Sequence, residues 1–599
     1  MTVGQLDDRD NILIRAVSSD ELMNSTRSIA QWVRLSGTPE EAEAFDWIEA
    51  KLKDYGLDVR RYAHPALVSW PESASLDILG AAGPDSVPCA THAFATSTPA
   101  GGLEGELIAV GTATAENLAK ANVRGKIALI DGIIAPNTNL LVEESGALAA
   151  IWIAGSRLHE RGLDPIWGTP TPETAHLLPK TPSVSVKGEE GPRIKAALAN
   201  GPVRVRLQTV VYQDWRTLPL LTGDLLPAGD TPEADLFVMF SGHVDSWYYG
   251  AMDNGTANAT MLEVSRILSQ HRDALRRGIR LCFWSGHSHA RYAGSAWYAD
   301  NFWHDLYDHC VAHVNVDSVG GNGATILSQG NSMSEVRDFV SDVIEQIAGQ
   351  ELARRRYGRA GDQSFWGHGI PAMLMSLSEQ PAANADPLLL ALHQQISGGA
   401  GAGGGLGYWW HTPEDTVDKI DPDFLKRDAT IYTLILNRLG TIPVLPFSYS
   451  AVVDDLGAVT SGIQEKAGQH FDLSPVLEQI AELRTAINAL DASLKTLRGS
   501  DASALQSIAN RGLMKIGRNL IPVDYTNTGQ FDHDLAVPTR PIPSLQPAAA
   551  LAAMDPNGAE YQYQSTRLVR ERNRVVFGLK QATLAANETN ARISQGWAG

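Results

Sequence analysis

The 599-residue sequence has little cysteine: Cys89, Cys282 and Cys310 are the only three. An odd, sparse set is not a disulfide framework, and without a C-x-x-C pair a thiolate zinc site of that kind is excluded. The first residues, Met1 to Asp8, lack the basic start and apolar core of a secretion signal. We therefore expect a reduced, cytoplasmic protein.

Long hydrophobic runs and positive charge are also lacking. No uninterrupted apolar run reaches the roughly 18 residues that a membrane-spanning helix needs. Lys and Arg number 49 against 68 Asp and Glu, which gives a formal net charge of −19. Because nucleic acids and anionic membranes are polyanions, we expect neither as a partner.

Apolar runs and helical patterns alternate between residues 215 and 445. Three runs predict buried strands, and a helical pattern lies between the first two: Leu236–Ser241, Ile279–Trp284 and Val311–Val316, with the helix at Thr260–Gln270. Strands that are apolar almost throughout are covered on both faces. The sequence therefore predicts an α/β fold with a mixed, mostly parallel sheet and helices on both faces, to which residues 1–70 also belong.

Two further parts differ from this core in pattern. Residues 71–214 contain short strand-like runs separated by Gly- and Pro-rich turns, which predicts an inserted β-rich domain that shapes access to a site elsewhere. Residues 446–599 predict a helical domain, with helices over 474–497 and 566–585. Such helices pack on the parent domain or on a second subunit. The glycine-rich stretch 398–405 predicts a mobile loop.

Metal-ligand side chains follow the predicted core strands. In open α/β sheets, ligands bind at the carboxyl ends of the strands, and neutral imidazole and carboxylate are natural zinc ligands. Asp253 can bridge two metal ions, and Asp245 is placed to accept the other N–H of His243. Five short segments fit this rule: 243–245, 253–255, 287–289, 315–318 and 411–416.

The segments around these candidate ligands resemble the motifs of a known family. Residues 241–246 and 250–255 resemble its G-x-H-x-D-S and G-A-x-D-N-G signatures, and 315–318, 369–372 and 411–416 resemble its N-x-D, G-I-P-A and H-T-x-x-D-T motifs. This is the family of co-catalytic zinc aminopeptidases (peptidase family M28-like), which includes glutamate carboxypeptidases, glutaminyl cyclases and the transferrin receptor ectodomain. The order and spacing agree throughout residues 236–420.

The resemblance implies a domain organisation. Residues 1–70 and 215–445 would form the zinc-peptidase-like catalytic domain, and 71–214 would be a protease-associated insert. Residues 446–599 resemble, more weakly, the dimerisation domain of the same family, which implies a homodimer.

The resemblance also implies a metal site for one or two ions, zinc or another divalent metal. One ion would be held by His243, Asp253 and Asp317. The second would share Asp253 and take His411 and one further ligand.

That further ligand is where the sequence departs from the family motif E-E-x-G-L-x-G-S. Aligned on Gly294-Ser295, Ser288 takes the place of the general-base Glu and His289 that of the ligand Glu. Imidazole is a good zinc ligand, but a serine hydroxyl does not accept a proton from water near neutral pH. His287 could supply the base, or a metal-bound hydroxide could act without one. The candidate catalytic residues are thus His287, Ser288 and Asp245.

We weigh three functions. The first is a metal-dependent hydrolase that cleaves an amide-type C–N bond in a small molecule or short peptide by activating water. The second is a metal-dependent lyase or cyclase on the same fold, and the third is a non-catalytic receptor-like or scaffold protein. Arg291, Arg354, Arg355, Arg356 and Arg359 could include a fork that binds a carboxylate, or they form a solvated turn.

Overall fold

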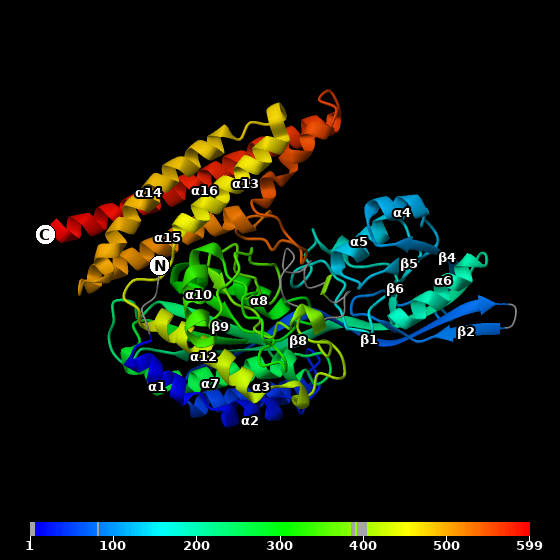
Figure 1. Ribbon diagram of the computed structural model, residues 1–599, viewed down its shortest axis with the longest axis horizontal. Coiled ribbons are helices and arrows are strands. Elements are labelled where there is room, and N and C mark those ends of the chain that lie inside the picture. The colour runs from blue at the N-terminus through cyan, green and yellow to red at the C-terminus, as the bar shows by residue number, and fades with distance from the viewer. Residues whose placement is uncertain (1–5, 81–82, 385–389, 392–403, 599) are drawn as a thin grey trace.

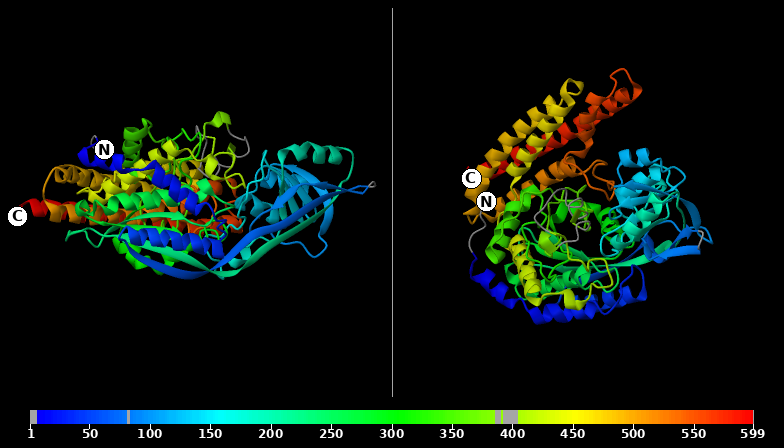
Figure 2. Two further views of the ribbon diagram at one scale, coloured as in Figure 1. Left: turned by 90° about the horizontal axis from the view of Figure 1, so that it is seen from below. Right: turned by 45° about the vertical axis from the view of Figure 1, so that its right-hand side comes forward.

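The computed structural model describes residues 6–80, 83–384, 390–391 and 404–598. Figure 1 shows a central α/β core, an insert that extends to one side of it, and a group of long helices along another side. The insert projects from the core in both views of Figure 2, and the helical group stands apart from the core in the right-hand view. Most of the predicted glycine-rich loop, residues 398–403, lies outside the described residues.

The core sheet runs in the order β12-β11-β9-β10-β8, with β1 at the edge beyond β8. The first four strands are parallel, whereas β8 is antiparallel to β10. The mixed, mostly parallel sheet is therefore confirmed. The parallel strands are β9 (Phe237–His243), β10 (Gly278–Trp284), β11 (Cys310–Asn315) and β12 (Ala372–Met373).

Both faces of this sheet are covered. In β9, Val238 and Phe240 pack into one hydrophobic cluster and Phe237 and Met239 into another, as expected from the alternation of side chains along a strand. The first face carries α2 (Ser19–Ile29), α3 (Pro39–Asp54), α7 (Ala257–Ser269) and α12 (Pro422–Thr441), with α1 (Asp8–Ala16) against α12. The other carries α8 (Ala293–Asn301) and α9 (Trp303–His309), and α10 (Ser334–Ala348) packs on α12 and β12.

The insert is joined to the core by two long antiparallel strands, β1 (Asp58–Gly80) and β8 (Arg204–Leu225). The predicted domain boundaries at 70 and 214 fall inside these strands, so the backbone runs from one part into the other without a break. The rest of the insert consists of β2 (Gly83–Val87), β3 (Cys89–Thr91), β4 (Leu103–Gly111), β5 (Ile127–Asp131), β6 (Ala149–Ile153), β7 (Ser183–Val186), α4 (Ala115–Ala121), α5 (Pro136–Glu144) and α6 (Gly191–Ala199).

The insert is rich in strands, as the sequence predicts, and it also contains short helices. Strands β4 to β7 are parallel to one another, and the three short helices accompany them. Strand β6 is buried at every residue, which explains why its apolar run shows no alternation.

The helical part follows the core. It contains α13 (Tyr449–Ala467), α14 (Ser474–Arg498), α15 (Ser503–Tyr525) and α16 (Ala559–Ala598), with a 3₁₀ segment at Pro543–Ala553. Helix α16 packs along α14 and α15. Shorter helical turns lie at Ala175–Leu177, Gly188–Glu190, Ala251–Thr256, Arg272–Ala274, Ala382–Asn384, Val417–Lys419 and Gly468–His470. No helix in the described part of the chain is both long and apolar enough to cross a membrane.

Candidate metal centre and its pocket

The site lies where the central parallel strands end. His243 closes β9 and is paired in register with Trp284, the last residue of β10. The end of β11, Asn315, is paired with Ser241 of β9. Because the three strands are parallel, the residues that follow them meet at the same edge of the sheet, as predicted.

Four of the five predicted ligands come together at this edge. His243 Nε2 lies 3.2 Å from Asp253 Oδ1 and 3.5 Å from Asp317 Oδ2. The other oxygen of Asp253, Oδ2, lies 2.9 Å from His411 Nε2. Asp253 therefore stands between two imidazoles and turns one oxygen to each.

The surroundings of His243 fit a cation. Its Nε2 is buried and has no hydrogen-bond partner among the described residues, although two carboxylates are close to it. Burial lowers the pKa of His243, but Asp253 and Asp317 reverse the effect and raise it well above its ordinary value. A proton or a metal ion therefore satisfies the same group, and a bound metal displaces the proton.

The orienting partner of His243 differs from the prediction. The ring Nδ1 lies 2.8 Å from the main-chain carbonyl of Asp245, whereas the nearer oxygen of the Asp245 carboxylate is 3.7 Å away. That carboxylate accepts hydrogen bonds from the main-chain amides of His287 (3.1 Å) and Ser288 (2.8 Å) and from the hydroxyl of Ser36 (3.0 Å). Asp245 thus holds the loop after β10 in place and does not face the pocket.

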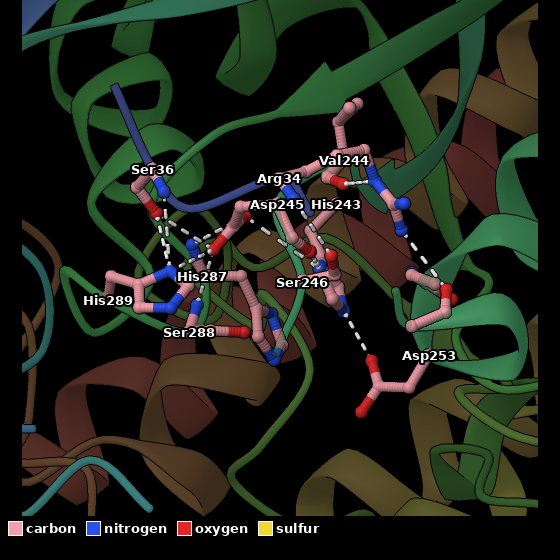
Figure 3. Close-up of polar contacts among 12 residues, drawn as sticks. Arg34, Ser36, His243, Val244, Asp245, Ser246, Asp253, His287, Ser288 and His289 are labelled. Carbon is pink, nitrogen blue, oxygen red and sulfur yellow. Dashed lines mark hydrogen bonds and ion pairs between the residues drawn. The ribbon is translucent and has the colours of Figure 1, made fainter. Parts of the chain in front are cut away.

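The loop after β10 separates the three residues that the sequence singles out. His287 and Ser288 line the pocket, but His289 does not. The His287 ring stacks on His243 with 3.8 Å between centroids. His289 is fully buried beside Ser36, and its ring meets the edge of Trp247. Figure 3 shows Asp253 and His289 at opposite sides of the group.

Arg34 and Asp415 support the ligand loops, and the sequence analysis missed both roles. The buried Arg34 guanidinium donates to main-chain carbonyls that include those of Val244 (2.7 Å) and Gly250 (3.0 Å). Asp415 accepts hydrogen bonds from the amides of Met252 (2.9 Å) and Asp253 (3.0 Å). Burial nonetheless raises the pKa of Asp415 to about 7.

All three parts of the chain contribute to the pocket beside these residues. The lining includes 135–137 and Arg161 from the insert, the strand-end loops of the core, and Ala536 and Pro538 from the segment between α15 and α16. Trp247 and Trp410 form aromatic parts of the wall. The lining of the pocket is therefore complete only when insert, core and helical part are together.

Several arginines face the pocket. Of the five that the sequence singles out, Arg291, Arg355 and Arg359 line it, and Arg356 instead forms an ion pair with Asp524 at 2.9 Å. Arg161 of the insert also lines the pocket, a position that no motif indicates. Its guanidinium lies over the Trp410 ring at 5.3 Å and makes no hydrogen bond or ion pair with the part of the chain described here. Arg291 donates to the carbonyl of Asp164 at 2.8 Å.

Known proteins resemble this chain in sequence. The sequence model of "Peptidase family M28" matches residues 226–435. A maize protein described as a probable glutamate carboxypeptidase is 25% identical over 72% of this chain and 68% of its own length. Mouse aminopeptidase NAALADL1 is 25% identical over 55% of this chain and 48% of its own length.

Solved structures agree on the fold. The aminopeptidase from Aneurinibacillus sp. strain AM-1 superposes with a TM-score of 0.54 at 21% identity, over 72% of this chain and 95% of its own. A peptidase M28 precursor from Shewanella amazonensis gives 0.54 at 20% identity, over 72% and 96%.

Fold and strand-end cluster together define a metal-dependent hydrolase that acts on peptide-type C–N bonds. More narrowly, residues 226–435 match the model of peptidase family M28, and the predicted resemblance to that family is confirmed.

Proposed function

We propose that the protein hydrolyses a C–N bond in a short peptide or small conjugate that carries an anionic group. One observation carries this proposal: Asp253, Asp317 and His411 share one pocket with Arg161, Arg291 and Arg359. A reacting bond at the metal ligands and a carboxylate at the arginines would then belong to one substrate.

Zinc is the proposed metal. Imidazole and carboxylate oxygen are the ligand types that zinc takes in hydrolytic sites, and the strand-end cluster of His243, Asp253, Asp317 and His411 contains both types. Two of the solved neighbours of lower similarity are described as a zinc aminopeptidase from Bacillus subtilis. Bound zinc polarises a carbonyl and makes water a better nucleophile at neutral pH.

The arginines argue for an acidic substrate group. Arg161 has no carboxylate partner within the described residues, and burial lowers its pKa to about 10, with neighbouring Arg291 acting in the same direction. An anion between these two guanidinium groups would offset their repulsion and supply acceptors for their N–H groups. The names of the relatives include both carboxypeptidases and an aminopeptidase. A pair of pocket arginines favours recognition of a substrate's terminal carboxylate.

Matched substrates test this proposal. Zinc-loaded protein would be given N-acyl dipeptides as free acids and as C-terminal amides, and amine release would be measured. We expect kcat/KM to be at least about 10-fold higher for the acids, because each charged hydrogen bond contributes about 1.5–3 kcal/mol. Equal rates for acid and amide would refute the anionic preference, and no turnover of either would refute hydrolysis of this class.

Variants assign the preference to the pocket. Arg161→Met should raise KM for the acids by about 10- to 100-fold and leave the amides unchanged. Arg204→Met is the control, since Arg204 lies on the exposed surface of the same insert. An effect of equal size in both variants would show that the pocket arginine has no special part in binding.

We also propose a homodimer, with residues 71–214 as a protease-associated type of insert. Along α16, Tyr563, Phe577 and Leu584 are exposed and stand at multiples of seven residues, so they share one face of the helix. A second copy of α16 is a suitable partner for such a face. Light scattering of Phe577→Asp against the unaltered protein tests the dimer. The free state of all three cysteines is consistent with a cytoplasmic location, which we also propose.

A further inference from the structure

We infer that the pocket binds a single metal ion through His243, His287 and Asp317, and that His289 and His411 do not hold a second one. The inference rests on the proposed metal dependence but departs from the paired-metal ligand set that the sequence motifs imply. One potential ligand atom from each of these three residues lies within 4.8 Å of those of the other two. Two imidazoles, a carboxylate and one open position form a common set for a catalytic zinc ion.

His287 is oriented as a ligand. Its Nδ1 lies 2.8 Å from Asp362 Oδ2, and the Asp362 side chain is buried. The other oxygen of Asp362 accepts a hydrogen bond from Ser295 Oγ at 2.9 Å. A carboxylate on one ring nitrogen is the usual support of a metal-binding histidine, because it fixes the tautomer and leaves the other nitrogen as the donor atom. Nε2 of His287 is therefore the nitrogen available to a metal.

His243 has the same arrangement. Its Nδ1 is engaged by the carbonyl of Asp245, and its Nε2 points to the carboxylates of Asp253 and Asp317. The parallel rings of His243 and His287 keep the two imidazoles side by side. Two supported imidazoles thus stand next to the Asp317 carboxylate.

His289, the residue that the family alignment places as a ligand, is held outside the pocket. The main-chain N–H of Ser36 donates to its Nδ1 at 3.3 Å. The same Nδ1 lies 3.0 Å from Ser36 Oγ and 3.5 Å from Asp245 Oδ2. The buried Nε2 makes no hydrogen bond or ion pair with the described residues, so no carboxylate stands beside it to share a metal ion. The side chain is fully buried and does not line the pocket.

His411 has too few companions for a second ion. Among the described residues its Nε2 faces Asp253 Oδ2 alone, its Nδ1 lies 2.8 Å from the carbonyl of Glu160, and its ring stacks on Trp410. A second ion would therefore have two protein ligands, whereas protein zinc sites have three or four. His411 and Asp253 form instead a hydrogen-bonded pair beside the ion.

Metal counting on the full-length protein tests this inference. Chelator-treated protein would be equilibrated with excess Zn²⁺, desalted and analysed by elemental mass spectrometry, with Co²⁺ absorption as a second readout. We expect about one ion per chain in the unaltered protein, in His289→Ala and in His411→Ala. We expect less than about 0.2 ions in His287→Ala, and recovery in His287→Asp, which restores a ligand.

His289→Ala is the matched control for His287→Ala, because it makes the same substitution two residues away. Circular dichroism checks that each variant is folded. Two ions per chain, or loss of metal in His289→Ala but not in His287→Ala, would overturn the inference. If His287→Ala is unfolded, a His287→Asp variant that stays at one ion supports it and one that binds none counts against it. Failure of the proposed function looks different: the protein would bind its metal but release no amine from either substrate series.

Discussion

Strands β9 and β10 have buried charge at both of their ends, and the two ends are built differently. Just before the strands lie Glu233 and Arg277, both fully buried. Arg277 Nε donates to Glu233 Oε2 at 3.1 Å, and Asn510 of α15 donates to Glu233 Oε1 at 2.6 Å. The remaining Arg277 donors meet the carbonyls of Leu439 and Ile442 at the end of α12. Every charged atom of the Glu233 and Arg277 side chains therefore has a hydrogen-bond partner.

After the strands the balance is different. His243 Nε2 has no hydrogen-bond partner among the described residues, and Asp253 and Asp317 face it without a basic side chain of fixed charge between them. Burial of charge without a full set of partners costs free energy. The ion pair before the strands, here called the first end, joins the core to the helical part and stabilises the fold. The cluster after the strands, the second end, has a full set of partners only when a cation is bound.

The largest expected effect comes from removing a carboxylate at the second end. Asp317→Ala should lower kcat/KM by about 10⁴-fold or more, equal to about 5.5 kcal/mol, because the metal can no longer be held to stabilise charge in the transition state. The unfolding free energy of the metal-free protein should stay the same or increase, since a clustered negative charge is lost. Initial rates and urea unfolding in chelator measure the two quantities.

Asp230→Ala, at an exposed position, is the control for Asp317→Ala and should change neither quantity. A metal-free Asp317→Ala protein that is destabilised by several kcal/mol would remove the distinction between the two ends.

Much of this arrangement could be predicted from the sequence. The buried strands are apolar runs, and polar ligand residues follow them directly, so the pattern placed His243, Asp253, Asp317 and His411 at one edge. These are local signals that depend on strand direction alone.

The rest depends on contacts between distant residues. Which histidine of the loop after β10 enters the pocket is decided by Asp245 and Ser36, which lie 42 or more positions away in sequence from their partners in this loop. Alignment on Gly294-Ser295 does not contain this information. Arg161 was missed for the same reason, because only the folded insert brings it against Trp410.

A smaller effect is expected from removing the buried ion pair at the first end. Arg277→Met leaves the buried Glu233 with only the more distant Arg276, whose Nε lies 3.8 Å from Glu233 Oε2, and should lower the unfolding free energy by about 3 kcal/mol. The kcat/KM of the folded protein should remain within about 2-fold, because this pair lies at the other end of the strands from the metal ligands. Chemical unfolding and rate measurements at low temperature separate these effects.

The double variant Glu233→Gln/Arg277→Met should recover part of the loss, since the unpaired charge is gone. If Arg277→Met abolished the activity of fully folded protein, the first end would have a role in the site as well.

The smallest of these effects concerns a buried carboxyl that belongs neither to an ion pair nor to the metal-ligand cluster. Glu335 in α10 is 3% exposed, and its Oε1 has no hydrogen-bond partner within the described residues. Burial raises the pKa of Glu335 to about 7. The folded protein therefore binds this proton more tightly than the unfolded chain, whose glutamates titrate near pH 4.3, so stability falls as pH rises from about 4.3 to 7 and is constant above that.

Glu335→Gln removes this titration, and its gain should reach about 3 kcal/mol at pH 8 and vanish near pH 4.5. Urea unfolding of both proteins from pH 4.5 to 8 measures the difference, with Glu345→Gln, on the partly exposed side of the same helix, as the control. A difference that is independent of pH would mean that the carboxyl has found a partner, as Glu233 has. A difference that grows with pH would show what a buried carboxylate costs when neither an arginine nor a metal ion accompanies it.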